Sequence, residues 1–243
     1  MRGYRRFHAA ALGAALLLAG CAGLATTSDR LATGSPAPAA AGGALSVLDV
    51  ATMLQDGWRI QPVRGLTDFR IAVVDGALAV TATGRGGASG LIRPLEADPK
   101  RCRRLRWTWR VDAIQQGADL ATRAGDDVAA SVFVLFGDPG ALGPVEPVPT
   151  LKYVWVGGDH APGAIQPNPY MPDHVVNVVA ATRDAPLGQW RTQTRDLYAD
   201  YETAFGDPPE DWIEAVAIFT DNDQTGEPVT AHYRDIALIC SET

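Results

Sequence analysis

The chain has 243 residues, a formal net charge of −7 and a hydrophobic content of 47%. An acidic protein is a poor general partner for nucleic acid, so we exclude that class of function. A domain of about 200 residues buries enough surface to fold without a metal ion or a disulfide, so no cofactor is required for folding.

The N-terminus has the pattern of a secretory signal peptide. Arginines near the start precede an apolar run over 9–18, and small residues follow up to Cys21. The run is too short for a permanent transmembrane helix. Leu18-Ala19-Gly20-Cys21 resembles the lipobox of bacterial lipoproteins. The resemblance implies cleavage before Cys21 and its acylation with fatty acids such as palmitate; the alternative is an ordinary secretion signal with a chance cysteine.

Cleavage would define three segments. The removed residues 1–20 contain three arginines and no acidic residue, so the mature chain has a charge of −10. Residues 21–44 are mostly Ala, Gly, Thr, Ser and Pro, which predicts a flexible tether. We expect residues 45–243 to form one β-sandwich domain. Ala22 follows the cysteine where an aspartate would imply retention in the inner membrane. This resemblance implies a protein of the cell envelope, anchored in the outer membrane and facing the periplasm.

A period of two dominates the remaining chain. Apolar residues at 69, 71 and 73 alternate with polar or small neighbours, and Asp75-Gly76 is typical of a hairpin turn. Strands are predicted near 69–73, 78–80, 91–92, 105–111, 128–136, 151–156, 175–180, 190–196, 215–220 and 232–239, with one helix over 197–205. Short strands and few helices favour an all-β fold, an antiparallel β-sandwich of jelly-roll type with one short helix.

Two predicted strands carry aromatic residues that could either pack in the core or stack on a sugar ring. Trp107 and Trp109 lie on the apolar face of one strand, which favours core packing over stacking on a sugar. Arg110 lies on the opposite face of that strand with two further arginines. Tyr153 and Trp155 share one face of a later strand and suit either role, because flat aromatic rings also stack on pyranose rings.

Cys102 and Cys240 are the two cysteines that remain after cleavage. An even number of cysteines in an exported, oxidising setting predicts a disulfide. Cys102 opens one strand-like run and Cys240 ends the last one, so antiparallel pairing of these strands would bring the two thiols together. Two buried thiols that never meet are the alternative.

A calcium site is one interpretation of the loop that starts at Asp221. Oxygen-bearing side chains at Asp221, Asp223 and Thr225, with Gly226 next, resemble the opening of an EF-hand loop. His232 stands where that loop needs a bidentate glutamate, and no helices flank it, so an EF-hand is excluded. A looser calcium site formed by these three residues stays open beside an Asx-rich turn without a ligand.

Asp126 and Asp127 precede the predicted central strand. Adjacent residues of an extended chain point in opposite directions, so we do not expect the two carboxylates to act together. One of them is expected to pair with an arginine such as Arg106 or Arg110. The sequence has no Gly-x-Ser-x-Gly, His-Glu-x-x-His or phosphate-loop motif. The catalytic residues of any enzyme here are therefore unknown, and a binding protein is favoured.

Several short segments follow one another in a fixed order along the chain. They are Ala88-Ser89-Gly90-Leu91, Arg106-Trp107-Thr108-Trp109-Arg110, Gly125-Asp126-Asp127, Tyr153-Val154-Trp155, Gln189-Trp190, Arg195-Asp196, Asp200-Tyr201, Phe205-Gly206, Thr220-Asp221-Asn222-Asp223 and Arg234-Asp235-Ile236. As an ordered set they resemble an uncharacterised family of secreted bacterial proteins, domain of unknown function 3047. No activity comes with the family. The resemblance implies a single domain in which these polar residues belong to one arrangement.

The sequence favours a lipid-anchored domain that binds a polysaccharide or glycoconjugate without catalysis. Jelly-roll sandwiches often present a polar face suited to glycans. The predicted ligand-binding residues are Arg110, Asp127, Tyr153, Trp155 and Asp221. The expected partners are the membrane, through the lipid anchor, and either a polysaccharide or an envelope protein.

Two other functions stay open. A glycan-cleaving enzyme would need two carboxylates about 5 to 10 Å apart in a cleft. The candidates for such a pair are Asp126, Asp127, Asp221, Asp223 and Asp235. A structural accessory lipoprotein would instead dock on an envelope complex and would present an exposed apolar patch.

Overall fold

The computed structural model describes residues 43–138 and 147–241. The predicted signal peptide, Cys21 and residues 21–42 of the predicted tether lie outside these residues. Residues 43 and 44, which the composition assigns to the tether, are instead the first residues of a strand. Within the described ranges, no helix has the length and apolar character needed to cross a membrane.

The described residues form thirteen strands, one α-helix and one 3-10 helix, η1. The strands are β1 (Gly43–Leu48), β2 (Arg59–Arg64), β3 (Asp68–Val74), β4 (Ala77–Thr83), β5 (Ala88–Ala97), β6 (Arg104–Ala113), β7 (Ala130–Phe136), β8 (Thr150–Val156), β9 (Ile165–Pro167), β10 (Val175–Thr182), β11 (Arg191–Asp196), β12 (Ile213–Asp221) and β13 (Thr230–Cys240). The helix α1 spans Leu197–Phe205, and η1 spans Met53–Gln55.

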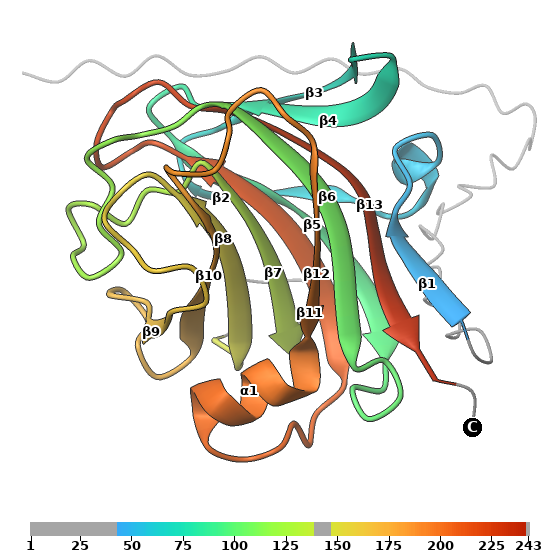
Figure 1. Cartoon of the computed structure of the whole chain (residues 1–243). Coiled ribbons are helices and arrows are strands. Elements are labelled where there is room, and N and C mark those ends of the chain that lie inside the picture. The colour runs from blue at the N-terminus through green and yellow to red at the C-terminus, as the bar shows by residue number, and fades with distance from the viewer. Residues whose placement is uncertain (1–42, 139–146, 242–243) are drawn as a thin grey trace, which may run out of the picture. The chain divides into compact units, whose positions relative to one another are not determined.

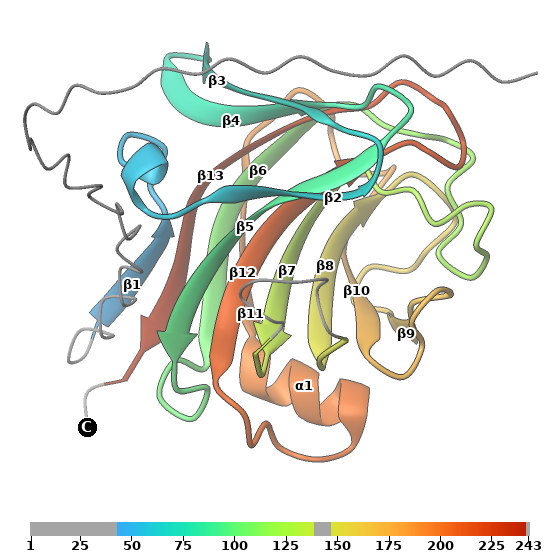
Figure 2. The ribbon, with the colours of Figure 1, turned by 180° about the vertical axis from the view of Figure 1, so that it is seen from behind.

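The strands form two facing sheets (Figures 1 and 2). Sheet A has the order β11-β6-β13-β4-β3, and β1 pairs with the second half of β13. Sheet B has the order β2-β5-β12-β7-β8-β10-β9. Every pair is antiparallel except β8 with β10. The helix α1 follows β11 directly and lies at one end of the sandwich (Figure 1).

This strand order is that of a jelly roll. The four strands β4, β13, β6 and β11 face the four strands β5, β12, β7 and β8, and the chain passes repeatedly from one sheet to the other. The predicted antiparallel β-sandwich of jelly-roll type with one short helix is therefore confirmed. The predicted strands do not include β1, β2 or β9. In β2 most side chains are exposed on both faces, which removes the apolar alternation.

The core between the sheets is rich in aromatic side chains. Trp107 and Trp109 of β6 are fully buried, as the sequence predicts. The ring of Trp107 lies 5.1 Å from that of Tyr153, and the ring of Trp109 lies 5.8 Å from that of Trp155. These contacts across the two sheets bury large apolar surfaces and hold β6 over β8.

Cys102 and Cys240 form a disulfide, which confirms the predicted pair. Cys102 lies before β6, and Cys240 ends β13. These two strands are antiparallel neighbours, and Ile239 lies opposite Arg104 in their register. The disulfide therefore links β6 and β13 covalently at the end of sheet A where β6 begins and β13 ends.

Candidate functional site

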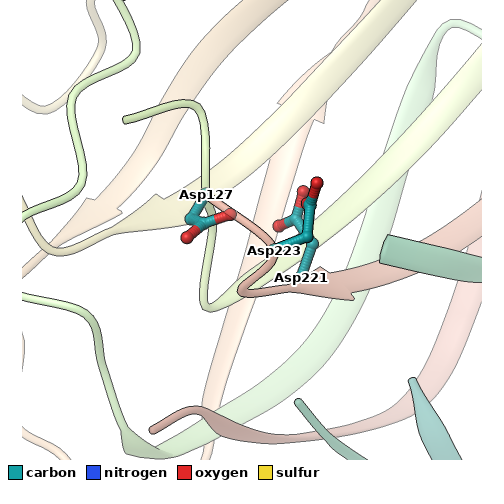
Figure 3. Close-up of side chains that lie close together, drawn as sticks. All are labelled: Asp127, Asp221 and Asp223. Carbon is teal, nitrogen blue, oxygen red and sulfur yellow. The ribbon is translucent and has the colours of Figure 1, made fainter. Parts of the chain in front are cut away.

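Three aspartates converge on the outer side of sheet B, at the end of β12 (Figure 3). One carboxylate oxygen from each of Asp127, Asp221 and Asp223 lies within 4.8 Å of the other two. Among the described residues, no other group of three His, Cys, Asp or Glu side chains brings its ligand atoms this close. Asp127 comes from the segment before β7, Asp221 ends β12, and Asp223 lies in the following loop.

Backbone hydrogen bonds hold the two buried members of this aspartate cluster. The Asp127 carboxylate accepts the N–H groups of Gln224 at 3.2 Å and Thr225 at 2.6 Å. Asp221 Oδ1 accepts the N–H of Val128 at 2.8 Å. The segment before β7 and the loop after β12 are thereby fastened to each other through side chains.

Burial changes the acidity of the aspartate cluster. Burial raises the pKa of Asp221 to about 8, and the nearby Lys152 opposes this rise. Burial also raises the pKa of Asp223, as does the charge of Asp127, whereas Arg64 opposes the rise from 3.4 Å. At neutral pH the cluster therefore favours either a proton on Asp221 or a cation among the carboxylates.

The aspartate cluster offers oxygen ligands of the type that calcium prefers. Asp223 Oδ1 is buried and has no hydrogen-bond partner among the described residues. Thr225, the third predicted ligand, contributes its backbone N–H to Asp127, and its hydroxyl accepts the N–H of Glu227 at 3.2 Å. The structure thus brings Asp221 and Asp223 together as predicted, with Asp127 as the third acid in place of Thr225.

Asp126 has different partners from its neighbour Asp127. Its Oδ2 accepts the Asn168 amide at 2.7 Å, and its Oδ1 lies 3.9 Å from the Lys152 ammonium. The expected pairing of one of these aspartates with Arg106 or Arg110 is therefore wrong. Those arginines lie on the outer face of sheet A, whereas both aspartates lie against sheet B.

A second network ties α1 to the core. The Tyr153 hydroxyl donates to Asp200 Oδ2 at 2.9 Å, and Arg195 donates to both oxygens of the same carboxylate at 2.9 and 2.5 Å. Burial and the Asp200 carboxylate raise the pKa of Tyr153. Trp155 donates from its ring N–H to the Thr182 carbonyl at 3.1 Å. Neither Tyr153 nor Trp155 reaches solvent, so neither ring can stack on a ligand in this structure.

Arg110 lies on the outer face of sheet A, where the alternation of β6 predicts it. Its guanidinium pairs with Asp112 at 2.6 Å and with Asp75 in the turn between β3 and β4. Asp112 also contacts His232 at 3.1 Å. Arg110 therefore fixes the β3–β4 hairpin to β6. The predicted ligand-binding residues lie in separate parts of the fold and do not form one surface.

The outer face of sheet A carries a hollow that the sequence did not reveal. Its volume is about 470 Å³. Its lining includes Arg106 and Thr108 of β6, Thr192 of β11 and Asp235 of β13, together with residues of β1. Alternation places Arg106 and Thr108 outward, but their proximity to Thr192 and Asp235 depends on strand pairing between distant segments.

The segments of the family resemblance fall into several networks instead of one arrangement. Asp127 and Asp221 meet in the aspartate cluster, whereas Tyr153 meets Asp200 beside α1. Ser89 belongs to a third, buried set, in which its hydroxyl accepts the N–H of Thr67 at 2.8 Å. The implied single domain is present, but its polar residues serve several separate purposes.

Solved structures similar to this chain include carbohydrate-binding modules and a hydrolase. A family 11 carbohydrate-binding module from Clostridium thermocellum, in complex with a β-1,3-1,4-mixed-linked tetrasaccharide, has a TM-score of 0.45 and 12% identity, covering 83% of this chain and 98% of that one. A family 30 module of a Clostridium thermocellum cellulase has a TM-score of 0.38 and 10% identity, covering 76% and 92%. The family 11 xylanase from Neocallimastix patriciarum has a TM-score of 0.37 and 12% identity, covering 80% and 94%.

The assignment of the fold rests on the strand order and not on these structural similarities. No curated protein sequence matches the chain. A sequence profile described as a protein of unknown function, DUF3047, matches residues 56–237, which is most of the domain. The chain therefore belongs to the DUF3047 family.

Proposed function

We propose that the domain binds a glycan in the hollow on the outer face of sheet A. The observation that carries this proposal is the shape and chemistry of the hollow. It is about 470 Å³ in volume, and polar side chains of β6, β11 and β13 line it beside apolar residues such as Leu48 and Ile236. Guanidinium, hydroxyl and carboxylate groups together supply the donors and acceptors that recognise sugar hydroxyls.

Arg106 is the side chain most available to a ligand. It is exposed and has no ion pair or hydrogen bond with a described residue. Beside it, the hydroxyls of Thr108 and Thr192 lie 2.9 Å apart and retain further hydrogen-bonding capacity. Next to Thr108 in the sheet, the Arg234 guanidinium lies 4.4 Å from the centre of the Trp190 ring. This stacked pair adds a flat surface beside the polar hollow.

The test is binding of the purified, non-acylated chain to a broad glycan array, followed by calorimetry with the retained glycan. Replacing both Arg106 and Thr192 by alanine should weaken binding by about tenfold or more, because a charge-assisted and a neutral hydrogen bond are lost. Arg59→Ala is the matched control, since Arg59 is an exposed arginine on the opposite sheet. Unchanged affinity in the double variant would exclude this hollow as the site.

If no glycan on the array binds the protein, the result would favour a structural accessory lipoprotein that docks on an envelope complex. The accessory-protein alternative requires an exposed apolar patch, and Val73 and Leu78 lie opposite each other at the exposed tip of the β3–β4 hairpin. The enzyme alternative has less support. Asp127 and Asp221 are close together but both are buried, so no cleft admits a glycan between them.

We also propose that Cys21 anchors the domain to the outer membrane, as the lipobox resemblance implies. The supporting observation is the order of the arginines, the apolar run and the small residues before Cys21. Mass spectrometry of the mature N-terminus should find acyl groups on Cys21. A chain that begins at another residue, or an unmodified cysteine, would contradict the anchor.

A further inference from the structure

A second hollow lies at the end of the sandwich that carries α1, away from the hollow proposed for glycans. Its volume is about 500 Å³. Tyr201 and Phe205 of α1 form its aromatic part, and Asp207, Glu210 and Asp211, from the connection between α1 and β12, form its acidic part. This combination of rings and carboxylates restricts the chemistry of a ligand.

The carboxylates of this acidic hollow lack partners in the described part of the protein. Asp207, Glu210 and Asp211 are exposed and make no ion pair or hydrogen bond with a described residue. Residues 196–233 contain ten acids and no lysine or arginine, so the chain supplies no nearby cation in sequence. The negative charge of the acidic hollow is therefore available to a ligand from outside.

Tyr201 is an independent sign of a ligand. Only 8% of this residue is exposed, and its ring packs against Phe136 and Phe205 with both centroid distances at 4.6 Å. Its hydroxyl nevertheless has no hydrogen-bond partner among the described residues, although the residue lines the acidic hollow. The hydroxyl is not among the fully buried polar atoms that lack a partner, so it reaches open space, and a hydrogen-bonding group of a ligand in the acidic hollow can contact it.

We propose that the acidic hollow binds the lysine or arginine side chain of a partner protein. Ammonium and guanidinium groups pair with carboxylates and are attracted to aromatic faces, so both parts of the acidic hollow favour them. A metal ion fits less well. Among the described residues, the aspartate cluster is the only group of three or more His, Cys, Asp or Glu side chains whose ligand atoms converge within 4.8 Å, and it does not include Asp207, Glu210 or Asp211.

Calorimetry of the full, non-acylated chain with short synthetic peptides tests this proposal. Peptides that contain lysine or arginine should bind, the affinity should fall with added salt, and the same peptides with acetylated lysines should bind much more weakly. Spermidine is a second probe, because it carries ammonium groups without a peptide. Binding of spermidine alone, with no peptide bound, would overturn the assignment to a protein partner.

Variants separate the acidic hollow from the general negative charge of the protein. Glu210→Gln with Asp211→Asn should weaken peptide binding by about tenfold or more, and Tyr201→Phe by a smaller factor. Glu202→Gln is the matched control, because Glu202 is an exposed acid of α1 outside the lining. Equal weakening by Glu202→Gln, or no binding of any cationic peptide at low salt, would overturn the proposal. Thermal unfolding of each variant verifies that it is folded.

Discussion

Asp221 shows at the scale of one residue how burial changes a carboxyl group. It is one of three aspartates with converging oxygens, and burial raises its pKa to about 8. Between about pH 4 and pH 8 the folded protein therefore holds a proton that the unfolded chain releases. Raising the pH through this range should lower the free energy of unfolding, because the carboxyl group ionises freely in the unfolded chain while burial keeps it protonated in the folded state.

Asp221→Asn should remove this part of the pH dependence. Asparagine keeps the oxygen that accepts the Val128 N–H but does not ionise. We expect the variant and the wild type to have similar melting temperatures near pH 5, and the variant to be the more stable near pH 9. If the melting temperatures of the two proteins changed in parallel with pH, the raised pKa would be contradicted.

If the aspartate cluster binds calcium, millimolar calcium at pH 8 should raise the melting temperature of the wild type but not that of Asp221→Asn. A chelator should reverse the effect.

The helix α1 is the element whose placement depends most on side-chain hydrogen bonds. Asp196 caps its first turn by accepting the Ala199 N–H at 3.0 Å, and Gly206 ends it with a positive φ of 90°. The sequence predicts the helix over 197–205 from the four-residue spacing of Leu197, Tyr201 and Phe205, and the structure adds these two terminal signals. The position of α1 against the core depends on side-chain hydrogen bonds instead, because Asp200 accepts from Tyr153 in β8 and from Arg195 in β11.

Asp200→Ala should lower the free energy of unfolding by about 3 kcal/mol, since it leaves a buried phenol and a half-buried guanidinium without their partner. Tyr153→Phe should cost about 1 to 2 kcal/mol, because the carboxylate keeps Arg195. Urea unfolding measures both changes. Glu202→Ala, at an exposed position of the same helix, should change stability by less than about 0.5 kcal/mol. Equal effects of Asp200→Ala and Glu202→Ala would show that this network does not hold α1.

At the scale of the whole molecule, one covalent bond closes most of the domain into a loop. The disulfide joins Cys102 and Cys240, which are 138 residues apart in sequence. It lies where β6 begins and β13 ends, so it fixes the two central strands of sheet A at one end. A loop of this length restricts the unfolded chain strongly, while the folded sandwich already holds the two strands side by side.

Replacing both cysteines by serine should lower the free energy of unfolding by roughly 2 to 5 kcal/mol and leave the fold intact. Chemical denaturation with circular dichroism measures both properties. Reduction of the wild type should produce the same loss, and adding reductant to the double variant should have no effect. A double variant as stable as the oxidised wild type would show that the bond contributes little.

Much of the fold was predictable because its signals are local. Alternation along 105–111 places Trp107 inside and Arg106 outside, and the structure agrees at both positions. The pairing of Cys102 with Cys240 followed from their places at the ends of two strands. The chain by itself therefore determined the class of fold, the helix and the disulfide.

The tertiary structure decided which polar side chains meet and which rings are covered. Trp155 has the same local pattern whether its face is open or closed, and packing against Trp109 of the other sheet closes it. Asp127 joins Asp221 because the segment before β7 lies beside the end of β12, about 90 residues away along the chain. Alternation is a property of neighbours in sequence, whereas these contacts depend on the pairing of distant strands, which no local pattern specifies.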